Sequence, residues 1–154
     1  MAPAPDYLID TNILLRLSRL DDPQHELVMK AVNQLNEDGA GLYFSLQNIA
    51  EFWNVCTRPA ERNGYGLTCA ETNLMIETAG DTIDYLPDNE HVYGIWRELV
   101  LAHSVRGVQV HDEHLVATMR AHGVSHILTL NRTDFLRFAE VQAVHPAQVQ
   151  PAAR

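Results

Sequence analysis

The chain has 154 residues, 46% of them hydrophobic, so its size and composition fit one globular domain with a core of its own. Its formal net charge of −9 at pH 7 is unfavourable for contact with a polyanion, because phosphate-binding surfaces are normally basic. No stretch is apolar enough to cross a membrane, and residues 1–5 lack the regions of a signal peptide, so we expect a cytoplasmic protein without membrane contact.

The first half of the chain alternates short strands with longer helices. The hydrophobic pattern predicts a strand at residues 7–10, helices at 13–20 and 24–38, a strand at 41–44 and a helix at 47–58. A turn-rich loop at residues 59–67 leads to a helix at 68–79, which opens with a capping box of Thr68 and Glu71. A strand at residues 82–86 follows.

The second half continues the alternation. We expect a helix at residues 89–103, a helix that follows the apolar stretch 108–110 and ends near His122, a strand at 127–130, a short helix, and a strand at 141–144. This order predicts an α/β fold, a three-layer sandwich with a mostly parallel central sheet and helices on both faces. The domain should span residues 6–146, with a flexible tail at 147–154.

Four acidic residues stand at the edges of these apolar segments: Asp10, Glu51, Asp112 and Asp134. Ligands of open parallel sheets bind at the carboxyl ends of the strands, so carboxylates there can converge on one divalent cation. Each acid also has a plainer interpretation. Asp10 and Asp112 suit helix caps, and Glu51 suits the solvated polar face of its helix.

A bound cation would give these acids a reason to lie together. Carboxylates held close to one another repel, and their pKa values rise unless a cation neutralises them. Mg²⁺ prefers oxygen ligands and is usually held by one or two carboxylates together with substrate phosphate. The pattern therefore favours a site for a hard divalent cation such as Mg²⁺.

Four short motifs contain the acids and follow one another in a defined order: Leu8-Ile9-Asp10-Thr11-Asn12, Ile49-Ala50-Glu51-Phe52, His111-Asp112, and residues 128–135 from Leu128 to Phe135. Each motif alone is weakly specific, whereas four in order are strongly specific. Together they resemble a PIN domain of the VapC type, and the resemblance covers roughly residues 6–146.

The resemblance implies a metal-dependent endoribonuclease that hydrolyses RNA phosphodiester bonds and whose acids hold Mg²⁺ or Mn²⁺. Such proteins are commonly the toxin of a toxin–antitoxin pair. It also implies an antitoxin protein as partner, and a homodimer. Asp10, Glu51 and Asp112 match the family's first three acids. Many relatives carry an acid where Asn131 stands, so we assign Asp134 as the fourth catalytic acid, with Asn131 in support.

The resemblance also suggests individual roles within the metal site. We expect Asp10 and Asp112 to bind the cation directly, and Glu51 and Asp134 to hold its waters or a second ion. Glu113 replaces a small residue of the family pattern, and its extra carboxylate would either weaken phosphate binding or recruit a cation.

Residues beside the acids are candidates for substrate binding: Thr11, Asn12, Arg58 and Asn131. Thr11 could equally be a turn hydroxyl, and Arg58 could equally form an intrahelical ion pair on the Glu51 face. Ten of the eleven basic residues are arginines, which suit phosphate contact despite the acidic balance.

Three other classes of protein share part of this pattern. A haloacid-dehalogenase-like phosphatase needs a second Asp where Asn12 stands, and a response-regulator receiver needs a late lysine, whereas Lys30 is the only lysine. A PIN-like RNA- or protein-binding module, with a catalytic site weakened at Glu113 and Asn131, remains an alternative.

Overall fold

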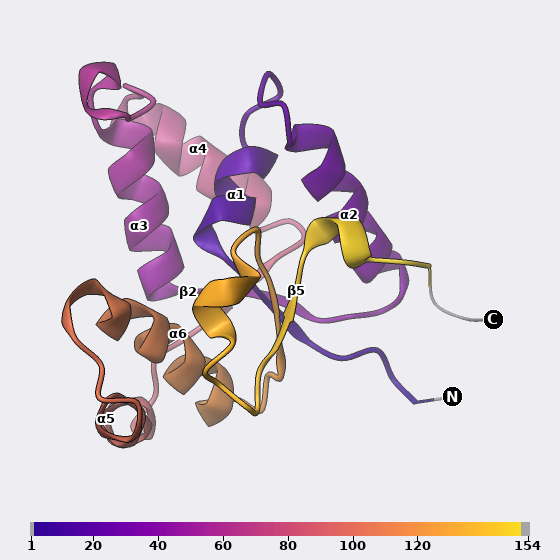
Figure 1. The fold of residues 1–154 in the computed structure, drawn as a ribbon. Coiled ribbons are helices and arrows are strands. Elements are labelled where there is room, and N and C mark those ends of the chain that lie inside the picture. The colour runs from indigo at the N-terminus through magenta and orange to yellow at the C-terminus, as the bar shows by residue number, and fades with distance from the viewer. Residues whose placement is uncertain (1, 152–154) are drawn as a thin grey trace.

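The computed structural model describes residues 2–151 and has a central sheet of five parallel strands (Figure 1). The strand order is β3-β2-β1-β4-β5, so β1 is central. The strands are β1 (Tyr7–Ile9), β2 (Leu42–Ser45), β3 (Asp84–Leu86), β4 (His126–Leu128) and β5 (Gln142–Val144). All of these pairings are parallel, which confirms the predicted fold class.

Helices cover both faces of the sheet, as the three-layer prediction requires. They are α1 (Thr11–Leu17), α2 (His25–Glu37), α3 (Leu46–Thr57), α4 (Cys69–Ala79), α5 (Val92–Ala102) and α6 (Val110–Ala121). Side chains alternate along a strand, so Tyr7 and Ile9 pack in one core cluster with α1, α2 and α3. Leu8 packs in a second cluster with α5 and α6 on the opposite face (Figure 1).

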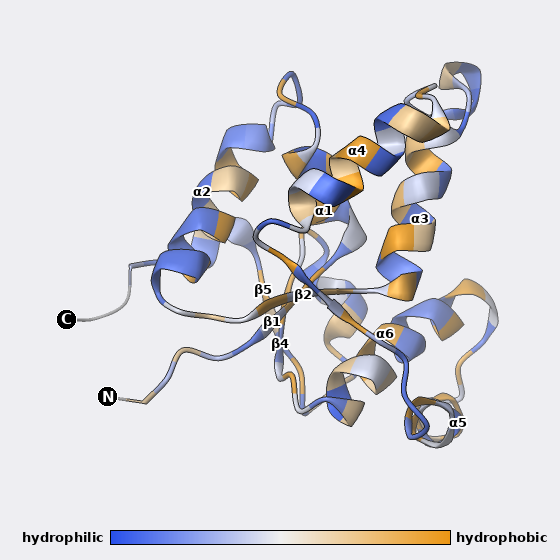
Figure 2. Cartoon of the chain, turned by 180° about the vertical axis from the view of Figure 1, so that it is seen from behind, coloured by the Kyte–Doolittle hydropathy of each residue, from blue (hydrophilic) through white to orange (hydrophobic). Residues whose placement is uncertain are grey.

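Figure 2 shows that each helix carries both hydrophilic and hydrophobic residues. In α2 the buried residues Val28, Ala31, Val32 and Leu35 recur at helical spacing, and most of the other positions are polar. An amphipathic helix has to bury its apolar face against another layer, and here that layer is the sheet. No helix within residues 2–151 has the length and apolar character needed to span a bilayer.

Several helix boundaries differ from the predicted ones, among them both ends of α1 and the starts of α5 and α6. Helix α1 ends at Leu17, with Ser18 as its C-cap, and Leu20 beyond it is 85% exposed, so a longer helix would bury little more apolar surface. Helix α6 begins at Val110 with Gln109 as its N-cap, so the prediction that Asp112 caps this helix was wrong. Asp112 lies in the first turn, where the helix dipole still favours a carboxylate.

Residues 146–148, at the start of the expected flexible tail, are folded. They form a 3₁₀ helix, η4 (Pro146–Gln148), which packs against α2 and buries Pro146. The His145 ring accepts a hydrogen bond from the Ala147 amide at 3.1 Å and fixes the start of this turn. The last part of the expected tail, residues 152–154, lies outside the described residues.

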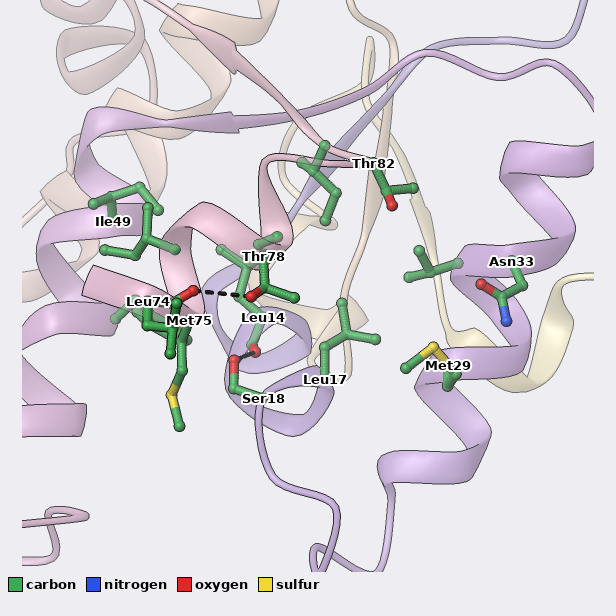
Figure 3. A pocket seen from close by; sticks show the side chains of 15 residues that line it. Leu14, Leu17, Ser18, Met29, Asn33, Ile49, Leu74, Met75, Thr78 and Thr82 are labelled. Atoms are coloured by element: carbon green, nitrogen blue, oxygen red, sulfur yellow. Dashed lines mark hydrogen bonds between the residues drawn. The ribbon is translucent and has the colours of Figure 1, made fainter. Parts of the chain in front are cut away.

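An apolar pocket of about 360 Å³ lies among α1, α2, α3 and α4 (Figure 3). Its lining includes Leu14, Met29, Ile49, Leu74 and Thr82. None of the four acids singled out in the sequence lines it. The pocket is therefore separate from the candidate active site.

Gly64 should not tolerate a side chain. The loop after α3 folds back on the helix end, where the Gly66 amide donates to the Arg58 carbonyl at 2.9 Å, and a Cβ on Gly64 would overlap that same carbonyl. We expect Gly64→Ala to lower the free energy of unfolding by about 1–3 kcal/mol, the usual cost of forced overpacking. Urea denaturation measures this, with Gly94→Ala as control, because a Cβ there meets open space.

Candidate active site

Asp10 lies at the carboxyl edge of the sheet, directly after the central strand. Its amide donates to the Leu128 carbonyl of the neighbouring strand at 3.0 Å. Its carboxylate accepts hydrogen bonds from the Thr129 hydroxyl at 2.7 Å and from the Thr11 amide at 2.8 Å. It is the N-cap of α1 and only 8% exposed. The cap interpretation and the edge-of-sheet interpretation therefore both apply to Asp10.

The surroundings of Asp10 disfavour its charge. Burial raises the pKa of Asp10 to about 6, against the opposing effect of hydrogen bonds from Thr129 and Thr11. The negative charges of Glu51 and Asp112 raise this pKa further. Asp10 is thus a buried acid near two others, and a cation would relieve both the burial and the repulsion.

Glu51 is directed towards Asp10 by the way α3 begins. Ser45, the last residue of β2, caps α3 in a capping box with Asn48, so the helix starts at the same sheet edge. The Thr11 hydroxyl donates to Glu51 Oε2 at 2.9 Å and accepts from Asn48 Nδ2 at 3.1 Å. Gln47 donates to Glu51 Oε1 at 2.8 Å. The polar face of α3 therefore points into the site.

Asp112 and Asp134 come from two further segments. Asp112 is half-buried in the first turn of α6, and Asp134 is exposed in the 3₁₀ helix η3 (Arg132–Phe135). Burial is the largest cause that raises the pKa of Asp112; the charges of Asp134 and Glu51 add to it, while Arg137 opposes it. Gln47 links this region to α3, since its amide also donates to the His111 carbonyl at 2.9 Å.

The four predicted acids therefore share one electrostatic environment, but they form a loose group. Within residues 2–151, no three acidic, histidine or cysteine side chains are close enough together to hold one metal ion. Hydrogen bonds and an ion pair hold the acids individually: Thr11 and Gln47 hold Glu51, and Arg137 lies 3.5 Å from Asp112. The donor chemistry, all carboxylate oxygen, fits a hard divalent cation.

Thr11 and Asn12, two of the expected substrate ligands, bind the acids themselves. The Thr11 hydroxyl is occupied by Glu51 and Asn48. Asn12 Nδ2 lies 3.3 Å from Asp10 Oδ2, and its Oδ1 accepts the Leu130 amide at 3.2 Å. Both side chains thus orient carboxylates of the site.

Arg58 and Asn131 occupy different places. Arg58 donates to the Asn63 carbonyl at 3.1 Å beyond the end of α3, about 10 Å along the helix from Glu51, and within residues 2–151 no ion pair joins the two. Asn131 is exposed at the start of η3, and its amide donates to the Thr129 hydroxyl at 3.0 Å. Asn131 is therefore the nearer of the two to Asp10.

Glu113 does not point into the acid group, contrary to both roles suggested for it. It is fully buried and bonded to Arg137 at 2.8 Å and to His103 at 3.2 Å. Its charge is neutralised inside the fold, so it neither repels a phosphate nor offers itself to a cation. Its position directly after Asp112 gave no sign of this, because its partners lie elsewhere in the chain.

Four side chains of the site had not been singled out for their contacts: Gln47, Asn48, Thr129 and Arg137. Thr129 had one available signal, because it follows the buried residues Ile127 and Leu128 at the edge where Asp10 was expected. Gln47 and Asn48 had only their place on the first turn of the helix that carries Glu51. Gln47 and Thr129 donate to the acids and Asn48 donates to Thr11, whereas Arg137 also brings a positive charge 3.5 Å from Asp112.

Thr129 should lower the pKa of Asp10, and this can be tested. In Thr129→Val the hydroxyl donor is lost, so we expect the pKa of Asp10 to rise further in the metal-free protein. Carboxyl-carbon NMR titration measures it. Thr118→Val is a matched control, since the Thr118 hydroxyl donates to a different acid, Asp88, at 2.9 Å. Equal Asp10 titration in both variants would contradict the assignment.

Comparison with known proteins agrees with this fold. The PIN domain family profile matches residues 7–141. One similar structure is VapBC2 from Rickettsia felis, bound to a promoter DNA fragment. A chain of it matches this one with a TM-score of 0.67 and 12% sequence identity, over 90% of this chain and 97% of that one. FitAcB from Neisseria gonorrhoeae has a TM-score of 0.62 and 20% sequence identity, and the match covers 92% of this chain and 99% of that one.

VapC20 from Mycobacterium tuberculosis, described as a sarcin-ricin-loop-cleaving toxin, has a TM-score of 0.58 and 16% identity, over 79% of this chain and 87% of that one. No curated protein sequence matches the chain. The structural likenesses concern the fold, whereas the family profile covers most of the chain. On that match, this chain belongs to the PIN domain family.

Proposed function

We propose that this PIN domain is a metal-dependent endoribonuclease that hydrolyses RNA phosphodiester bonds with Mg²⁺ or Mn²⁺. The observation that carries the proposal is the placement of Asp10, Glu51, Asp112 and Asp134 at one edge of the parallel sheet, where each charge acts on another. VapC20, whose fold is similar, is described as a toxin that cleaves the sarcin-ricin loop. Membership of the PIN family adds support.

Each acid has a role in the proposed mechanism. Asp10 and Asp112 would hold the cation, while Glu51 and Asp134 would bind water molecules around it or a second ion. A bound cation would supply Lewis-acid chemistry at this edge: activation of water and stabilisation of charge on the leaving oxygen. Thr11 and Thr129 keep Glu51 and Asp10 oriented through bonds of 2.9 and 2.7 Å. No nucleophilic side chain is required.

Substrate contact would come from the rim of this edge. Asn131, exposed beside Thr129, is placed to meet an RNA phosphate near the acids. Arg58 is farther along α3 and could contact only a part of the strand distant from the cleaved bond. A bound cation would offset part of the net charge of −9 that otherwise opposes RNA binding.

A cleavage assay tests the proposal directly. The purified chain should cut a single-stranded RNA in the presence of Mn²⁺ or Mg²⁺, and EDTA should abolish the cleavage. A DNA strand of the corresponding sequence serves as the substrate control. Absence of cleavage with either metal on a panel of structured and unstructured RNAs would sink the nuclease assignment.

We also propose that the chain is the toxin of a toxin–antitoxin pair and that it forms a homodimer. Support for the toxin role comes from solved neighbours: one is described as a toxin–antitoxin complex, and another as a member of a family of toxin–antitoxin systems. Induced expression in a bacterial host should arrest growth, and co-expression of the protein encoded beside it should relieve the arrest. Light scattering of the purified chain measures the dimer. A monomer at micromolar concentration would contradict the dimer alone.

One observation favours the alternative, a PIN-like RNA- or protein-binding module. The acids are loosely grouped, and Asn131 replaces a charge that many PIN domains carry. The buried position of Glu113 removes the other reason to regard the site as weakened. A binding module would bind RNA in filter assays without cutting it, and its affinity would not depend on Mn²⁺.

A further inference from the structure

Arg137 links the two segments that carry the third and fourth acids. Its Nη1 donates to the Asp134 carbonyl at 2.8 Å, and its Nη2 donates to the Gln109 carbonyl at 3.4 Å. Nη2 also lies 3.5 Å from Asp112 Oδ2. One planar guanidinium therefore spans the start of α6 and the 3₁₀ helix η3.

Glu113 fixes this guanidinium from inside the fold. Its Oε1 accepts the Arg137 Nε–H at 2.8 Å, and its Oε2 lies 3.2 Å from His103 Nδ1. The Arg137 guanidinium also lies over the Phe138 ring, 4.6 Å from its centre. Because Glu113 is fully buried, loss of its cation would leave an uncompensated charge in the core, which keeps the pair together.

We propose that Glu113 and Arg137 form a brace that sets the position of Asp112 relative to Asp134, and that Arg137 is a positioning residue for the metal site. This inference rests on the proposed function. Groups that orient metal ligands typically change metal affinity by about 10–100-fold when they are removed. Arg137 has the geometry for such a role, since its fork of fixed donors reaches both the start of α6 and η3 at once.

A purely structural ion pair would need fewer of these contacts. Of the Arg137 donors, only Nε bonds to Glu113. Nη1 and Nη2 are both directed at the segments that carry Asp112 and Asp134. Glu113 thus anchors the guanidinium, and the remaining donors position the site. The two roles can be separated by variants that keep the fold and remove the bridge.

The double variant Glu113→Leu/Arg137→Met removes the charges of both partners, of which Glu113 is fully buried and Arg137 partly exposed, and keeps most of their apolar volume. Thermal unfolding should stay near wild type, because a buried ion pair can be replaced by apolar side chains without loss of stability. Mn²⁺ affinity, measured by calorimetry on the metal-free protein, should fall by about 10–100-fold. Arg137→Lys is the second variant: it keeps the charge beside Glu113, cannot form the bridge, and should also bind Mn²⁺ more weakly.

Leu35→Ala controls for destabilisation alone, because Leu35 lies in the core cluster on the opposite face of the sheet. It should lower the unfolding temperature and leave Mn²⁺ affinity unchanged. Wild-type Mn²⁺ affinity in both Arg137→Lys and the double variant would overturn the brace while leaving the nuclease proposal intact. A wild-type chain that binds no Mn²⁺ would overturn both.

Discussion

Asp10→Asn is expected to reduce RNA cleavage by roughly 10²–10³-fold or more, the scale on which loss of one preorganised electrostatic group lowers turnover. Asp10 is the most buried of the four acids and is flanked by hydrogen bonds from Thr129 and Thr11. An amide at this position can still bind an ion through oxygen but contributes no negative charge. Initial rates at saturating Mn²⁺, with circular dichroism to check the fold, measure the effect.

The matched control for this loss is Asp81→Asn. Asp81 is an exposed aspartate after α4 and takes part in none of the contacts of the acid group. The same amide substitution there should leave cleavage unchanged, which separates loss of the site from loss of one surface charge. Equal activity of Asp10→Asn and wild type, in preparations free of other nucleases, would exclude Asp10 from the proposed chemistry.

Metal-free protein should lose stability as pH rises from about 4 to about 7, because of Asp10. Burial raises the pKa of Asp10 from 3.8 to about 6, so the folded state holds this proton over a range where the unfolded state has released it. The unfolded state then binds fewer protons, and the free energy of unfolding falls with pH. The full effect is about 3 kcal/mol, at 1.36 kcal/mol for each pKa unit.

Comparison with Asp10→Asn isolates this effect from other groups. We expect the stability of the variant relative to wild type to increase between pH 4 and pH 7 and then level off, as measured by urea denaturation in EDTA. Added Mg²⁺ should stabilise wild type at pH 7 and shrink that difference, since a ligand of the folded state raises its stability. A difference that stays flat with pH would contradict the raised pKa of Asp10.

The central features of the fold were readable from local sequence. Tyr7–Ile9 is a wholly apolar and buried strand, and the acid after it therefore had to lie at the carboxyl edge of the sheet. The capping box of Thr68 and Glu71 marked the start of α4, and the structure confirms it. Periodicity and caps are short-range signals, so they can be read from one chain.

Contacts between distant segments could not be read in this way. The Thr129 hydroxyl that orients Asp10 comes from 119 residues away, and the Arg137 bonded to Glu113 comes from 24 residues away. The start of α6 was also misjudged, because Asp112 has the chemistry of a cap and only packing places the first turn earlier, at Val110.

The sequence by itself determined that this chain alternates strands and helices and that Asp10 lies at the carboxyl end of the first strand. Hydrophobic period and capping chemistry depend on neighbours within a few residues, so one sequence is enough to predict these helices and strands. Only the tertiary structure decided that Glu113 is a buried partner of Arg137, that Thr11 and Asn12 orient acids, and that residues 146–148 fold against α2. Those outcomes depend on which surfaces the packed layers bring together. A buried charge has to be paired, and its partner is set by the side chains that packing places beside it.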